Sequence, residues 1–97
     1  MIAKTIRIKL NNQTIYGYTI KLPNANLVLA TAKKGFVCCG YLNLETAQKL
    51  GDAACVVHGV KTVADLLKAK VVGLTPKAMA LGVKLGMRGQ EALSLML

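Results

Sequence analysis

Residues 26–42 read NLVLATAKKGFVCCGYL, and the order of apolar and turn-forming residues in this stretch decides the fold. Residues 26–32 form a continuous apolar run, which indicates a strand buried on both faces. Residues 33–35 (KKG) predict a tight turn, in which Gly35 is free to adopt a positive φ. Residues 36–42 then return as an antiparallel strand. We therefore expect a hairpin at the centre of a β-sheet.

A second hairpin is predicted on the N-terminal side of the first. Residues 3–10 and 14–22 alternate between apolar and polar side chains, the period of two that is typical of half-buried strands. The polar residues between them predict a three-residue loop, which sets Ile8 opposite Tyr16. That register places Tyr16 and Tyr18 together on the apolar face of the hairpin.

Short helices are predicted after the two hairpins because a capping residue precedes each apolar helical segment. Asn43 precedes LETAQKL, and Thr62 precedes VADLLKAK with Asp65 placed to complete a capping box. Pro76 opens a third helix, PKAMAL, and residues 87–97 are helical by spacing. The expected fold is α+β: an N-terminal antiparallel β meander of two hairpins, followed by short helices packed on the sheet.

The composition predicts one domain that buries apolar surface against other copies of itself. Ninety-seven residues fit a single domain, 1–97, and 54% of them are apolar. A monomer of this size has too little interior for so many apolar side chains. We therefore expect a homo-oligomer.

The chain shows no pattern that would direct it to a membrane or an oxidising compartment. Lys or Gly interrupts every apolar run well before the length of a membrane span, and the first ten residues alternate instead of forming a signal peptide. Three cysteines, an odd number, favour reduced thiols over a disulfide framework. These features predict a cytoplasmic protein.

The positive charge is concentrated in the N-terminal half of the chain. Residues 1–42 contain six basic residues and no acidic one, and the net charge is +9. A basic face favours anionic partners such as nucleic acid or nucleotides. The alternative is that spaced lysines keep strand edges soluble. Only 4% of residues are aromatic, which is few for a surface that stacks nucleic-acid bases.

The three cysteines, Cys38, Cys39 and Cys55, do not have the spacing of a metal site. Neighbouring strand residues point to opposite faces, so Cys38 and Cys39 are not expected to share an ion. We interpret Cys38 and Cys55 as core residues. Cys39, next to Gly40 at a strand end, is the candidate catalytic nucleophile, with His58 as a candidate base. Enzymatic activity stays open at this point.

The segment HGVKT (58–62) suggests an anion-binding turn. Gly59 permits close backbone approach, Lys61 supplies a cation, and Thr62 begins a helix whose first N–H groups are unpaired. The alternative is a capped turn with an exposed lysine. GMRG (86–89) carries the same two interpretations with one arginine.

Three glycine-containing segments follow one another along the chain: GFVCCGYLN (35–43), GVKTVADLL (59–67) and LGVKLGMRGQEAL (81–93). Together they resemble the YunC-like family of small bacterial and archaeal proteins, a domain of unknown function. The resemblance implies a small α+β fold and a tetramer assembled through the N-terminal β-sheet, which makes the hairpin of residues 1–22 the expected oligomerisation element. It implies no established activity, substrate or cofactor. Cys39 falls on the family pattern, whereas Cys38 and His58 do not.

Three hypotheses follow from the sequence. The first is a homo-oligomer, without cofactor, that binds a small anionic ligand where the Cys39–Gly40 strand end meets the 59–62 turn. The second is a cysteine-dependent hydrolase or transferase that uses Cys39, and the third is a nucleic-acid-binding protein that uses the basic N-terminal half. The candidate ligand-binding residues are Gly35, Cys39, Gly40, Gly59, Lys61 and Thr62.

Overall fold

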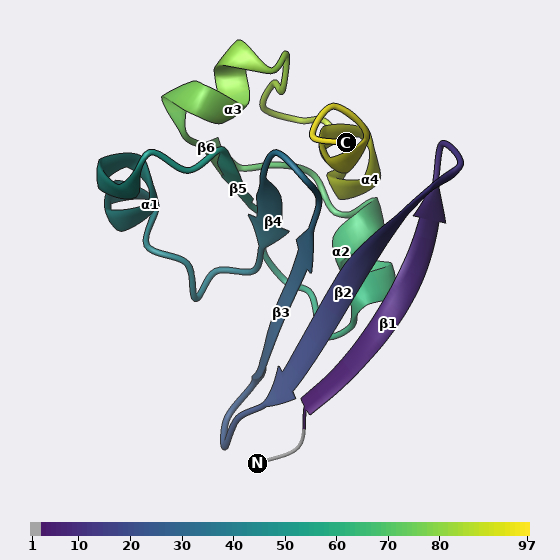
Figure 1. Cartoon of the computed structure of the whole chain (residues 1–97). Helices are drawn as coiled ribbons and strands as arrows, with labels where there is room; N and C mark the ends of the chain where they lie inside the picture. The colour runs from purple at the N-terminus through teal and green to yellow at the C-terminus, as the bar shows by residue number, and fades with distance from the viewer. Residues whose placement is uncertain (1–2) are drawn as a thin grey trace.

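The computed structural model describes residues 3–97 and has the predicted α+β architecture (Figure 1). Six strands form one sheet in the order β1-β2-β3-β4-β5-β6, in which β4 and β5 are parallel and all other neighbours antiparallel. The elements are β1 (Ala3–Leu10), β2 (Gln13–Lys21), β3 (Asn26–Thr31), β4 (Phe36–Cys38), α1 (Leu44–Leu50), β5 (Ala54–Val56), α2 (Val63–Lys68), β6 (Gly73–Leu74), α3 (Pro76–Ala80) and α4 (Gly89–Ser94).

The helices lie on both sides of the sheet but cover it unequally. Helices α2 and α4 pack on the face that bears Val28 and Val37, and the core between them is fully buried. Helix α1 packs on the opposite face near β5 and β6, where a Leu44 methyl lies 2.6 Å from the place a Cβ on Gly73 would occupy. The opposite face of β1, β2 and β3 carries no helix (Figure 1).

The predicted register of the first hairpin is wrong by one residue. The turn has two residues, Asn11 and Asn12, with φ of 50° and 64°, and Ile8 pairs with Ile15. A two-residue turn with positive φ at both positions matches the twist of the strands, and asparagine tolerates that backbone. The shift moves Tyr16 and Tyr18 to the face without helices.

Gly17 then takes a core-facing position that the predicted register did not give it. A Cβ on Gly17 would lie 2.6 Å from Cγ1 of Val63 and 3.2 Å from Cδ1 of Ile8. The absence of a side chain therefore lets the first residue of α2 approach the hairpin closely. This contact fixes the distance between β2 and α2.

The central hairpin lies in the middle of the sheet, as predicted, but differs from the prediction in three details. Strand β4 ends at Cys38 instead of residue 42. Strand β3 is covered on one face, since Val28 and Ala30 are fully buried whereas Leu27 and Leu29 are half-buried. Gly35 does not adopt the positive φ that the turn allowed. A Cβ there would collide with the carbonyl oxygen of Ala53, so glycine is needed for close packing.

The predicted helix caps are present, although three helices are shorter than expected, α3 by one residue. Asn43 Oδ1 accepts a hydrogen bond from the Thr46 amide at 3.2 Å, and Gly51 ends α1 with φ of 81°. Helix α2 ends at Lys68 instead of residue 70, because Ala69 is extended. Helix α4 spans six residues of the predicted 87–97.

Thr75 anchors α3 to the sheet as a buried cap. Its hydroxyl donates to the carbonyl oxygen of Asp52 at 2.8 Å and accepts from the amides of Ala54 at 3.0 Å and Ala78 at 3.3 Å. One side chain thus satisfies groups on a loop, a strand and a helix. Within residues 3–97, no helix is long and apolar enough to cross a membrane.

Candidate functional site

Four of the predicted ligand-binding residues line one cavity of about 380 Å³, which we call the junction cavity. Cys39 and Gly40 follow β4, and Gly59 and Lys61 follow β5. Because β4 and β5 are parallel neighbours, the segments that leave their carboxyl ends lie side by side. The complete lining is Ala25, Asn26, Cys39, Gly40, Tyr41, Gly59, Val60 and Lys61.

Cys39 is buried and its sulfur is engaged with the neighbouring strand. Its amide donates to the carbonyl oxygen of Val28 at 2.9 Å, and the Val28 amide donates to Cys39 Sγ at 3.4 Å. Strand β4 ends at Cys38, so the sulfur takes the place of a backbone acceptor for a buried N–H group. Only 5% of Cys39 is exposed.

The other two cysteines are also buried, as expected for core residues. Burial, with the neighbouring Cys39, raises the pKa of Cys38 to about 12, and burial alone raises the pKa of Cys55 to about 11. Both thiols are therefore neutral near pH 7. Cys38 and Cys39 belong to one buried cluster, and Cys39 contributes to the raised pKa of Cys38.

His58 lies outside the junction cavity. Its exposed ring lies against Gly40, with Cδ2 3.3 Å from the position of a Cβ on that glycine. The ring lines a different cavity together with Leu42 and Leu44. The structure thus places Cys39 and His58 in different cavities on either side of the Gly40 backbone.

The 58–62 segment forms a capped turn, which the sequence allowed as the alternative to an anion-binding turn. Gly59 has φ of 73°, the amide of Lys61 donates to Asp65 Oδ2 at 3.1 Å, and the amide of Asp65 donates to Thr62 Oγ1 at 3.1 Å. The hydrogen bond from the Lys61 amide is the main cause that lowers the pKa of the Asp65 carboxyl. Two amides of the turn are therefore already occupied by side chains.

Gly35 and Thr62 do not line the junction cavity. Gly35 lines a separate cavity of about 310 Å³ with the neighbouring Lys33, Lys34 and Asp52. Arg88 of the GMRG segment also has a structural role, since its Nη1 donates to the carbonyl oxygen of Lys68 at 2.8 Å and caps the end of α2.

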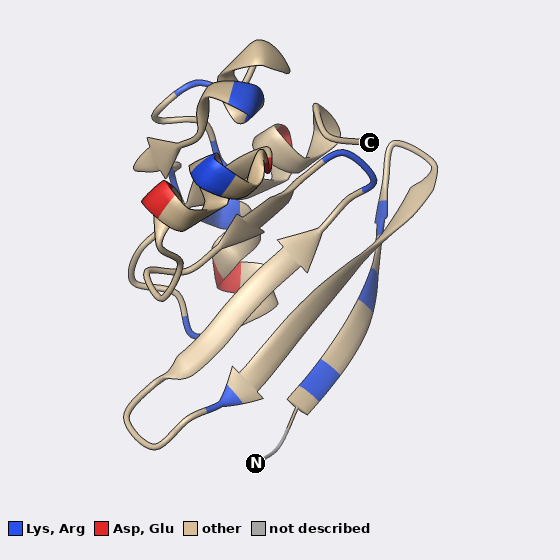
Figure 2. Cartoon of the chain, turned by 60° about the vertical axis from the view of Figure 1, so that its left-hand side comes forward, with Lys and Arg blue, Asp and Glu red and all other residues tan. Residues whose placement is uncertain are grey.

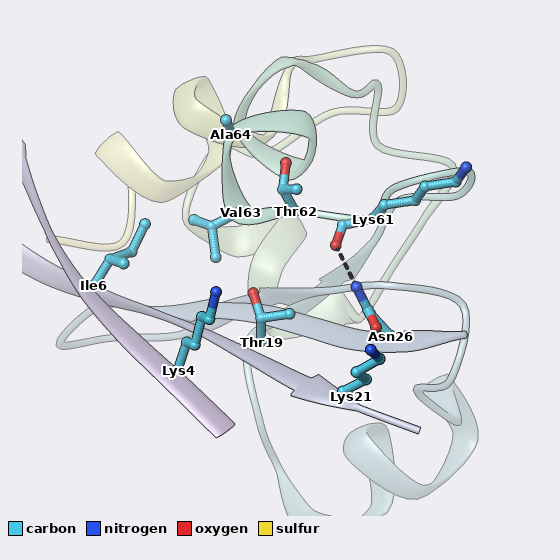
Figure 3. Close-up of a pocket in the computed structure, with 9 residues that line it drawn as sticks. All are labelled: Lys4, Ile6, Thr19, Lys21, Asn26, Lys61, Thr62, Val63 and Ala64. Atoms are coloured by element: carbon cyan, nitrogen blue, oxygen red, sulfur yellow. Dashed lines mark hydrogen bonds between the residues drawn. The ribbon is translucent and has the colours of Figure 1, made fainter. Parts of the chain in front are cut away.

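A larger cavity, about 500 Å³, lies between the first hairpin and the start of α2, and we call it the hairpin cavity (Figure 3). Its lining is Lys4, Ile6, Thr19, Lys21, Asn26, Lys61, Thr62, Val63 and Ala64. Asn26 Nδ2 donates to the carbonyl oxygen of Lys61 at 3.0 Å. Both residues line both cavities, so this hydrogen bond lies between them.

Sequence reasoning missed the hairpin cavity because its residues come from distant segments. Lys4, Thr19 and Lys21 were assigned to an assembly element, and no motif connects them to α2. The available signal was the alternation of the strands: with the correct two-residue turn, all three fall on the face that carries Gly17.

The charged groups of the hairpin are largely without ionic partners. Within residues 3–97, the single ion pair joins Lys49 and Glu45 at 3.6 Å on the surface of α1. Lys and Arg residues occur along β1 as well as in the helices and loops, whereas Asp and Glu residues lie in or beside the helices (Figure 2). No three His, Cys, Asp or Glu side chains come together as a metal-binding group in the described part of the chain.

Comparisons with known proteins give matches over most of this structure. The family model described as "Domain of unknown function (DUF1805)" matches residues 38–96. The chain is 34% identical over 90 residues to "Uncharacterized protein YunC" of Bacillus subtilis, which covers 89% of each protein. It is also similar to the crystal structure of a protein of unknown function from Thermoplasma acidophilum, with a TM-score of 0.94, 33% identity, and coverage of 99% of this chain and 94% of the other.

Proposed function

The chain belongs to the DUF1805 family, and from its geometry we propose that it is a cytoplasmic, homo-oligomeric protein that binds a small anionic ligand in the junction cavity. The observation that carries the ligand proposal is the convergence of Cys39, Gly40, Gly59 and Lys61 on one cavity from two parallel strand ends. Ligands of α/β sheets commonly bind at such carboxyl ends.

The chemistry of the junction cavity supports a small ligand with one negative charge. Lys61 is the only charged residue in its lining, and the two glycines leave backbone groups accessible. The exposed ring of Tyr41 supplies an apolar surface at the same cavity. A volume of about 380 Å³ lies within the range of small-molecule sites.

A matched pair of variants tests the ligand proposal. Amide chemical shifts would be followed by two-dimensional NMR during titration with acetate and benzoate, two monovalent carboxylates. We expect benzoate to shift the amides of Gly40, Tyr41 and Gly59, and Lys61→Gln to weaken its binding at least fivefold. Lys70→Gln, which removes an exposed lysine outside the cavity, should leave binding unchanged. Equal weakening by both variants would argue against a site in this cavity.

The face of β1, β2 and β3 without helices supports assembly. Tyr16 is 42% exposed, and Tyr18, Ile20, Leu27 and Leu29 are half-buried on the same face. Contiguous apolar surface of this kind on a small protein marks an interface with another chain. We propose that this face, which belongs mainly to the N-terminal hairpin, packs against further copies of the chain to form a tetramer.

Light scattering coupled to size-exclusion chromatography tests the assembly. We expect a mass four times that of the 10.3 kDa chain. Ile20→Lys places a charge at the centre of the apolar face and should shift the protein toward smaller species. Gln13→Lys adds the same charge on the other face of β2 and should not. A monomer for the unmodified protein would refute the assembly.

A further inference from the structure

The hairpin cavity is built differently from the junction cavity and has different ligand chemistry. Two lysine side chains, Lys4 and Lys21, reach it from neighbouring strands, and no acidic residue contributes to its lining. Neither lysine has a carboxylate within 4 Å in the described part of the chain. Within the described residues, Lys4 and Lys21 thus bring two positive charges to the cavity without a carboxylate partner, and Lys61 is the third lysine of its lining.

The strand register brings these two charges to one place. Lys4 pairs with Thr19, and Lys21 follows two residues later on the same face of β2. Such diagonal neighbours are typically about 7–8 Å apart at Cα, which long side chains can span. In Figure 3 the amine of Lys4 and the hydroxyl of Thr19 both point from the sheet toward the start of α2. The amine of Lys21 lies beside Asn26 (Figure 3), so rotation of this flexible side chain toward Thr19 would let one anionic group contact both amines.

The remaining polar groups around the cavity already have partners or point elsewhere. Thr62 Oγ1 accepts from the Asp65 amide, and the amide of Lys61 donates to the Asp65 carboxylate. The amine of Lys61 points away from Lys4 and Thr19 (Figure 3). The nearby Asp65 carboxylate is thus engaged with backbone groups of the turn. The two hairpin amines and the Thr19 hydroxyl are therefore among the groups left for a ligand.

The other wall of the cavity is apolar. Val63 of α2 faces the hairpin (Figure 3), Ala64 also contributes to the lining, and Ile6 is 46% exposed although it lies on the core-facing side of β1. An apolar side chain this exposed, beside two amines, fits a ligand that has both an anionic end and an apolar body. The volume of about 500 Å³ accommodates such a molecule.

We propose that the hairpin cavity is a second binding site, which takes a phosphate monoester with a small apolar or aromatic body. The phosphoryl group lies between the amines of Lys4 and Lys21 and accepts from the Thr19 hydroxyl. A phosphate monoester carries nearly two negative charges at pH 7 and three acceptor oxygens, so it matches two ammonium groups better than a carboxylate does. The apolar body packs against Ile6 and Val63. Four of these five contact residues, all except Val63, precede the segment matched by the family model.

The test is an NMR titration of the full chain with phenyl phosphate, inorganic phosphate and phenol. Phenyl phosphate should shift the amides of Lys4, Thr19, Val63 and Ala64, inorganic phosphate should bind the same place more weakly, and phenol should cause no shift there. Binding of phenyl phosphate should weaken as salt is raised, because both contacts are ionic.

Two double variants separate this site from a general charge effect. Lys4→Gln with Lys21→Gln should weaken phenyl phosphate binding at least tenfold, whereas Lys9→Gln with Lys33→Gln, which remove the same charge from exposed positions outside the cavity, should change it less than twofold. Equal weakening by both pairs would overturn the proposal. So would the absence of shifts at millimolar phenyl phosphate, or shifts confined to Gly40, Tyr41 and Gly59, which would support the junction cavity instead.

Discussion

Replacing Gly17 with alanine tests how the hairpin is held on α2. The added Cβ would lie 2.6 Å from Val63 Cγ1 and 2.9 Å from Cγ2, distances that real Cβ atoms do not show. Val63 is 3% exposed, so its branched side chain has little room to turn away. Overpacking of a core costs about 1–3 kcal/mol, and alanine recovers about 0.5–1 kcal/mol that glycine loses in a strand. We expect Gly17→Ala to lower the free energy of unfolding by about 1–2 kcal/mol.

A double-mutant cycle isolates the contact itself. Val63→Ala removes two buried methyl groups and should cost about 2 kcal/mol alone. In the double variant the methyl group at position 17 fills part of the space vacated at position 63. The loss in the double variant should therefore be smaller than the sum of the single losses by about 1–2 kcal/mol.

Urea unfolding followed by circular dichroism measures the cycle, at one chain concentration because assembly makes stability concentration-dependent. Gly86→Ala is the matched control: Gly86 has φ of 88° and nothing lies within 4 Å of its Cβ position. Gly86→Ala should lower the free energy of unfolding by about 1 kcal/mol through backbone strain. Its effect and that of Val63→Ala should be additive within about 0.5 kcal/mol. If Gly17→Ala and Val63→Ala were also additive, Gly17 would not lie under α2 and the two-residue turn would be in doubt.

Three further predictions concern single buried side chains. Thr75→Val should lower the free energy of unfolding by about 2–4 kcal/mol, because the buried amide of Ala54 loses its acceptor; an equal loss in Thr75→Ser, measured by urea unfolding, would contradict this. The contribution of Cys55 to stability should be complete below pH 9 and lost as the pH rises toward 11, because burial raises its pKa from 9.0 to about 11 and the unfolded thiol ionises first. Urea unfolding should then show a shallower alkaline decline for Cys55→Ala, and parallel declines would exclude the effect. Iodoacetamide at pH 7 should label Cys39 far more slowly in the native protein than in urea, since the side chain is 5% exposed. Mass spectrometry of the Cys39 peptide measures the labelling, and equal rates would show that the sulfur is accessible.

The α+β class and the helix caps could be predicted from the sequence because they depend on neighbours in the chain. An N-cap hydrogen bond joins residues three apart, so Thr62 and Asp65 are recognisable without knowledge of the rest of the molecule. The central hairpin was similarly marked by two apolar runs around a lysine-rich turn. The junction cavity could be anticipated in part, because its glycines stand immediately after apolar strands.

The tertiary structure decided the register of the first hairpin and everything that depends on it. Two adjacent asparagines allow either a two-residue or a three-residue loop. Packing favours the two-residue turn, because that turn places Gly17 under Val63, where a side chain would not fit. The roles of Gly35 and Cys39 could not be predicted from neighbouring residues in the sequence either, since they depend on contacts with the Ala53 carbonyl and the Val28 amide.

The sequence by itself therefore determined which segments become strands and helices, where the helices begin, and that the N-terminal half is basic. It left undetermined which faces of those elements meet, because a shift of one residue exchanges the two faces of a strand without changing its local preferences. The hairpin cavity exists only after that choice, when Lys4 and Lys21 come to face a helix that begins more than forty residues later in the chain.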